Sequence, residues 1–208
     1  MITFACFSPH APILLAEVGS PQDRAKVKKT LQTLEFLGKQ FKEAEIDEII
    51  ISSPHSDWGF NVPLSFLAPN FKGKIIPYLT GLESPEFHFH QGQEFYKEPN
   101  YKLLTTNYKV ALIASGDTSH CLKPDGPYGF HVDGPKFDRD LRECLKKKDM
   151  ERILRLDDLY PEAADCGLRS FAFLLGILEA AKIAWQPEIL SYEGPFGVGY
   201  LVVNLKLN

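Results

Sequence analysis

The chain has 208 residues, of which 44% are hydrophobic and 24% charged, and its formal net charge is −4. These values are ordinary for a globular protein and suit one well-buried domain over residues 1–208. They argue against nucleic acid as the main partner, since phosphate neutralisation needs clustered Lys and Arg, and no apolar run approaches the length of a membrane-spanning helix.

The N-terminus and the cysteines indicate the compartment. The N-terminus lacks the basic region and long apolar segment of a secretory signal, so we expect a cytoplasmic protein. The four cysteines, Cys6, Cys121, Cys144 and Cys166, are scattered without a C-x-x-C pair. This spacing excludes the common zinc-knuckle motifs and suits reduced thiols. The sequence leaves the oligomeric state open, with a homodimer as one option.

The first half of the chain alternates between strand and helix patterns. An apolar run at 2–7 predicts a strand, and residues 21–42 carry apolar side chains at helical spacing. Residues 46–52 predict a second strand and 74–78 a short third one. The pattern then weakens: residues 87–90 alternate like a strand, whereas the Gln-Gly-Gln-Glu segment after them favours a helix.

The second half resumes the alternation and ends in two strands. Its predicted elements are a buried strand at 109–114, helices at 136–147, 149–156 and 168–183, and strands at 187–192 and 198–206. Only Gly194-Pro195-Phe196-Gly197 joins the last two strands, and so short a connection predicts an antiparallel hairpin. The sequence therefore predicts an α/β fold with a mixed, mainly parallel central sheet.

Side chains that can carry chemistry follow several predicted strands. The same tripeptide, Ser-Pro-His, places His10 and His55 just beyond two of them, and His120 and Glu193 follow two later strands. Strands of an α/β sheet bring their carboxyl ends to one mouth, where such sheets bind ligands. Two histidines and a carboxylate are a common metal-binding set, which leaves the fourth side chain as an acid or base. A Ser-Pro-His segment can also be only a strand exit, since proline favours turn geometry.

The ligand set His10, His55 and Glu193 does not by itself select a reaction. Two imidazoles and one carboxylate suit non-haem Fe(II), which binds a substrate and dioxygen together. The same ligand types also hold catalytic zinc, whose activated water attacks an ester or amide. The residues alone therefore leave both iron-dependent oxygen chemistry and zinc-dependent hydrolysis open.

A series of motifs spread over nearly the whole chain narrows this choice. They are Ser8-Pro9-His10-Ala11-Pro12, Pro54-His55-Ser56, Gly116-Asp117-Thr118-Ser119-His120, Gly126-Pro127-Tyr128-Gly129-Phe130-His131 and Tyr192-Glu193-Gly194. In this order they resemble the class III extradiol ring-cleavage dioxygenases, specifically the LigB-type catalytic subunits and the related Memo-like proteins. The resemblance implies a three-layer-like sandwich with helices on both faces of the sheet. It also implies a non-haem Fe(II) ion held by His10, His55 and Glu193.

The resemblance further implies an activity. The protein is expected to open a catechol-type ring beside the diol, with O2 as the second substrate. His120 would be the acid/base with Asp117 close behind it, and Tyr128 and His131 would bind substrate groups. For His131, a solvated loop residue is an equal alternative.

Two other functions stay open beside the dioxygenase. Memo-like relatives share the scaffold without an established ring-cleaving role, and some have cysteine at the carboxylate position. Glu193 is expected to place this chain among those that can activate oxygen. The alternatives are a Memo-like metal-binding or partner-binding protein and a zinc-dependent hydrolase.

Overall fold

The computed structural model describes residues 1–98 and 108–208. Within them, six strands form one sheet in the order β3-β2-β4-β1-β6-β5. The strands are β1 (Ile2–Ser8), β2 (Glu48–Ser53), β3 (Lys74–Leu79), β4 (Val110–Ser115), β5 (Trp185–Glu193) and β6 (Tyr200–Leu207). The pairs β1–β4, β2–β4 and β2–β3 are parallel, and β1–β6 and β5–β6 are antiparallel. The predicted mixed, mainly parallel sheet is confirmed.

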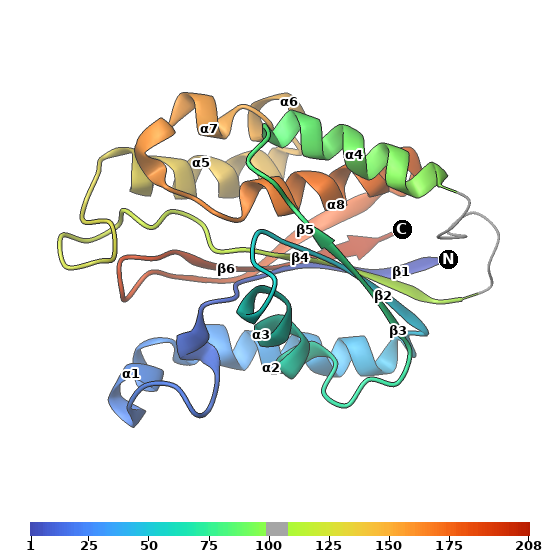
Figure 1. Ribbon diagram of the computed structural model, residues 1–208, viewed down its shortest axis with the longest axis horizontal. Helices are drawn as coiled ribbons and strands as arrows, with labels where there is room; N and C mark the ends of the chain where they lie inside the picture. Colours follow the sequence, from blue (N-terminus) through green and yellow to red (C-terminus); the bar gives the residue numbers. More distant parts are fainter. Residues whose placement is uncertain (99–107) are drawn as a thin grey trace.

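Helices cover both faces of this sheet and make the predicted three-layer sandwich (Figure 1). One face carries α1 (Pro21–Lys26), α2 (Lys28–Glu43) and α3 (Trp58–Leu67). The other carries α4 (Pro85–Lys97), α5 (Asp133–Lys147), α6 (Met150–Ile153), α7 (Leu156–Leu159) and α8 (Leu168–Ala180). Short 3₁₀ helices, η1 (Pro12–Leu14) and η3 (Pro161–Ala163), lie in the connections.

An apolar cluster lies on each side of the sheet, because successive strand residues point to opposite faces. In β1, Phe7 stacks on Phe171 of α8 with ring centroids 4.3 Å apart. Phe4 of the same strand contacts Phe41 of α2 on the other side, at 5.4 Å. A strand buried on both faces reads as a nearly continuous apolar run, which is why β1, β2 and β4 are plain in the sequence.

Two predicted elements differ from the structure. The helix expected over 21–42 is interrupted at Val27, whose φ of −110° and ψ of 19° separate α1 from α2. Residues 87–90 lie in α4 and not in a strand, because Ser84 caps that helix by accepting a hydrogen bond from the Phe87 backbone N–H at 3.2 Å. Residues 99–107, which follow this segment, lie outside the described residues.

Helix α3 was not predicted from the sequence. It is short, with 10 residues, and contains Pro63, which the helical pattern does not accommodate. Its importance is positional, because it begins three residues after His55 and presents Trp58 beside that histidine. In the part of the chain that the structure describes, no helix has the length and apolarity needed to cross a bilayer.

Candidate metal and acid–base site

The loops that follow β1, β2 and β4 open onto one pocket of about 680 Å³. Five of the residues singled out from the sequence line it: His10, His55, Asp117, His120 and Tyr128. They converge because three neighbouring parallel strands end at the same edge of the sheet. The expectation that strand-end histidines meet at one mouth therefore holds for these residues.

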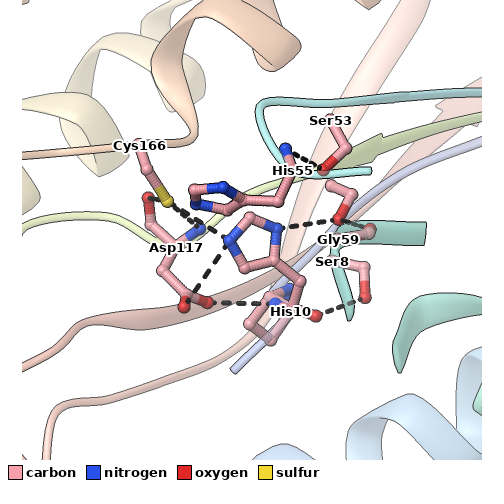
Figure 2. A network of polar contacts seen from close by, with 9 residues as sticks. Ser8, His10, Ser53, His55, Gly59, Asp117 and Cys166 are labelled. Atoms are coloured by element: carbon pink, nitrogen blue, oxygen red, sulfur yellow. Dashed lines mark hydrogen bonds and ion pairs between the residues drawn. The ribbon is translucent and has the colours of Figure 1, made fainter. Parts of the chain in front are cut away.

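Three side chains that could hold a metal ion stand together: His10 and His55, which line this pocket, and Cys166 beside them. Their donor atoms all lie within 4.8 Å of one another, and His10 Nε2 is 3.3 Å from Cys166 Sγ. Figure 2 shows these side chains and Asp117 pointing toward one another. Two imidazoles and a thiolate form a donor set that suits zinc, iron and copper. The residues present therefore fit a metal ion.

Hydrogen bonds fix which nitrogen of His10 is available. Its Nδ1 lies 3.1 Å from Ser115 Oγ, and the Ser115 hydroxyl donates to the carbonyl of Gly59. Because the serine proton is used there, His10 Nδ1–H is the donor to Ser115 and Nε2 keeps its lone pair. Burial, together with neighbouring His55, lowers the pKa of His10 to about 3. The ring is neutral, as a metal ligand requires.

A close approach between two glycines brings Cys166 to the strand ends. A Cβ on Gly116 would lie 2.2 Å from the Cα of Gly167, so the end of β4 packs directly on the turn before α8. The Asp117 carbonyl accepts a hydrogen bond from Gly167 N at 2.9 Å, and Asp117 N donates to Cys166 Sγ at 3.3 Å. Burial, and then the Asp117 carboxylate, raise the pKa of the thiol. A coordinated cation reverses this effect, because a coordinating thiol is deprotonated.

Asp117 and His120 lie beside these donors and interact with each other electrostatically. Asp117 is buried and accepts a hydrogen bond from His10 N at 3.0 Å. Burial raises its pKa to about 6, while the charge of a protonated His120 opposes that shift. Burial lowers the pKa of His120, and the Asp117 carboxylate opposes that change. A neutral imidazole next to a carboxylate can accept a proton and have the resulting charge stabilised.

Glu193, the predicted third ligand, lies elsewhere. Its carboxylate accepts hydrogen bonds from the backbone N–H and the hydroxyl of Thr30, at 2.7 and 2.6 Å. Thr30 is in the first turn of α2, whose N-cap residue, Val27, provides no side-chain hydrogen bond. Glu193 therefore caps α2 from the end of β5, where a carboxylate satisfies a free N–H and the helix dipole. In this structure Cys166, and not Glu193, stands with His10 and His55.

Of the two residues predicted to bind substrate, only one lines the pocket. Tyr128 lines the pocket with its ring edge-on to His120, at a centroid distance of 5.7 Å. His131 is not among the pocket-lining residues, and its Nδ1 accepts a hydrogen bond from Asp133 N at 3.3 Å where α5 begins. With 44% of its side chain exposed, His131 fits the alternative of a solvated loop residue.

Sequence reasoning did not place Cys166 or Trp58 in the site. For Cys166 the available signal was the Cys-Gly step directly before the apolar helix. For Trp58 the available signal was its position three residues after His55. That position indicates a contact with His55 only once α3 is known to begin at Trp58.

Comparison with known proteins identifies the family. Residues 53–203 match the family described as the catalytic LigB subunit of aromatic ring-opening dioxygenase. Protein CA_C1420 of Clostridium acetobutylicum is 40% identical over 151 residues, which are 72% of this chain and 31% of that protein, so the chain spans about a third of that relative. The crystal structure of uncharacterized protein JW3007 from Escherichia coli K12 has a similar fold, with a TM-score of 0.60 and 13% identity over 97% of this chain and 99% of that one. The match over residues 53–203 shows that the chain belongs to the LigB family of aromatic ring-opening dioxygenase catalytic subunits.

Proposed function

We propose that this protein is a metal-dependent dioxygenase that opens a catechol-type ring beside the diol, at a metal held by His10, His55 and Cys166. The observation that carries the proposal is the placement of their donor atoms within 4.8 Å of one another at a pocket that also contains Asp117 and His120. Membership of the LigB family supports the aromatic ring-opening chemistry.

The donor set determines what a bound ion would do. Fe(II) is the metal we propose, with zinc as the alternative, because imidazole and thiolate bind both. Bound there, the ion supplies Lewis acidity toward phenolic oxygens and a place for dioxygen. The hydrogen bond between His10 Nδ1 and the Ser115 hydroxyl fixes the orientation of the imidazole ring. The Nε2 atom of His10 therefore points toward Cys166 and the site.

The remaining pocket residues move and stabilise protons. His120 Nδ1 is shielded from solvent, so Nε2 is the atom that accepts the proton of a substrate hydroxyl and later returns it. The Asp117 carboxylate stabilises the imidazolium formed in between. The Tyr128 ring lies edge-on to His120 at the pocket, where it can contact a bound diol.

A second function is favoured by one specific observation. Cys166 stands where an oxygen-activating facial triad has a carboxylate, and a thiolate also suits zinc or Cu(I). A Memo-like protein that binds a metal, or a partner through that metal, without opening rings would have the same donor set. The two functions differ in whether oxygen is consumed.

Metal analysis after anaerobic purification, followed by oxygen uptake on a panel of catechols, tests the proposal. Iron at about one ion per chain, with oxygen uptake and the yellow absorbance of a ring-opened product, is the expected result. A protein that is fully loaded with Fe(II) and consumes no oxygen with any catechol would favour the second function. Cys166→Ser protein treated in the same way is the control for activity of loosely bound iron.

A further inference from the structure

Resting on the proposed function, we infer that the substrate is an extended, uncharged aromatic diol. Its ring would carry a second ring or an apolar group of similar size, and it would not carry a carboxylate. The size of the pocket, the side chains of its walls and the charges along it each point to this class.

The pocket is much larger than one aromatic ring. Its volume is about 680 Å³, within the range of about 300–1,000 Å³ that is usual for drug-sized ligands. A dry apolar cavity of about 150 Å³ is already enough for benzene. A single-ring diol held at His10 and His55 would therefore leave most of the pocket to water.

The walls next to the metal donors are apolar and aromatic. Trp58 leans on the His55 ring at a centroid distance of 4.9 Å and an interplanar angle of 33°, and 42% of its surface is exposed. Phe196, from the turn between β5 and β6, and Ile13, from η1, extend the apolar surface. A second ring on the substrate would contact these side chains, and such aromatic contacts stabilise a complex beyond the area they bury.

The charges on the pocket disfavour an anionic substituent. Among the described residues that line it, Asp23 and Asp117 are acidic and none is Lys or Arg. Lys26 lies over the Phe196 ring at 5.2 Å, but its Nζ is already paired with Asp23 Oδ1 at 3.2 Å. The Asp23 charge is offset by the same pair, so a substrate carboxylate would meet the unpaired carboxylate of Asp117 and no unpaired Lys or Arg. Repulsion of this kind selects against an anionic substrate.

Binding to the zinc-loaded protein tests the inference without turnover. Three diols are titrated calorimetrically: catechol, 3,4-dihydroxybenzoate and 2,3-dihydroxybiphenyl. They share the metal-binding diol, so affinity differences report on the rest of the pocket. We expect 2,3-dihydroxybiphenyl to bind about tenfold more tightly than catechol, and 3,4-dihydroxybenzoate to bind more weakly than catechol.

Substitutions in the pocket wall test which side chains cause the preference for the biphenyl diol. Trp58→Ala and Phe196→Ala should each lower the ratio of biphenyl-diol affinity to catechol affinity by about threefold or more. Phe36→Ala is the matched control, because Phe36 is an exposed aromatic residue on α2 that does not line the pocket. Thermal midpoints near that of the wild type establish folding, and the wild-type series alone decides the inference if a variant does not fold.

The outcomes separate the inference from the proposed function. Equal affinities for catechol and the biphenyl diol, or tighter binding of the benzoate than of catechol, would overturn the inference alone. Failure of the zinc-loaded protein to bind any of the three would overturn the proposed function, and the substrate class with it.

Discussion

The carboxylate of Glu193 binds Thr30, 163 residues earlier in the chain, through two hydrogen bonds of 2.7 and 2.6 Å. Glu193 ends β5, and β6 separates β5 from β1 in the sheet. A residue that ends a strand at the same edge of the sheet can therefore still lie two strands away from β1, which precedes His10, and further from the strands that precede His120 and His55. There it meets the N-terminus of α2, which otherwise lacks a side-chain cap.

This relationship gives Glu193 a role in stability. Glu193→Ala should lower the free energy of unfolding by about 1–2 kcal/mol, since the Thr30 N–H loses its acceptor and the helix dipole loses a negative charge. Glu193→Gln should lose less, because an amide oxygen still accepts. Urea unfolding measures both, and metal content should equal that of the wild type. Loss of metal at unchanged stability would restore Glu193 as a ligand.

Cys166 should behave in the opposite way. Cys166→Ser should lower the metal affinity at least tenfold. Loss of a residue that only hydrogen-bonds to a metal ligand typically lowers affinity roughly 10–100-fold, and loss of the ligand itself should cost no less. The measurement is metal content after dialysis against a weak chelator, with His10→Ala and His55→Ala alongside. Cys144→Ala, at a buried cysteine of α5, is the control. Full metal occupancy in the Cys166 variant would remove it from the site.

Most of the fold was predictable because it rests on apolar periodicity. The strands that are buried on both faces are visible in the sequence as apolar runs, and the short turn with two glycines at 194–197 predicts the hairpin. Where the structure differs from the predicted elements, local features are responsible. The Ser84 cap begins α4 where the sequence alternates like a strand, and the backbone angles of Val27 separate α1 from α2. Caps and single backbone angles are weakly marked in a sequence.

The part of the site that lies at strand ends was predictable from the sequence. His10, His55 and the Asp117–His120 turn follow adjacent parallel strands, and one edge of the sheet gathers them. Cys166 follows no strand. It reaches the site because Gly167 fits against Gly116, a tertiary contact that only the packed chain reveals.

A buried carboxylate behind the Asp117–His120 turn makes stability depend on pH. Asp138 accepts hydrogen bonds from Ser119 N at 2.8 Å and from the Tyr192 hydroxyl at 2.6 Å. Burial raises its pKa from 3.8 to about 6, although these hydrogen bonds oppose the shift. The folded state therefore holds the proton more tightly, and this stabilisation is complete below pH 3.8 and lost as the pH rises through 6.

Asp138→Asn should remove that dependence. In metal-free protein, the unfolding free energy of the variant relative to wild type should rise by about 2–3 kcal/mol between pH 4 and pH 7, because only the wild type must bury a charge there. Urea unfolding across this range measures the difference, and the other titrating groups cancel between the two proteins. A difference that is constant with pH would show that Asp138 titrates in the folded state as it does in the unfolded one.

His120 and His131 give the most direct separation of a catalytic from a structural histidine. His120→Gln should retain the metal and bind a diol, while turnover falls by about a hundredfold or more, the scale for losing a positioned acid/base. His131→Gln should stay within about twofold of wild type in turnover, because His131 bonds to Asp133 at the start of α5 and does not line the pocket. Exposed His90, on α4, provides a control through His90→Gln. Steady-state oxygen uptake with an active diol compares all three. An unchanged rate in the His120 variant would assign proton transfer to another group, whereas a large loss in the His131 variant would mean that its loop reaches the substrate during turnover.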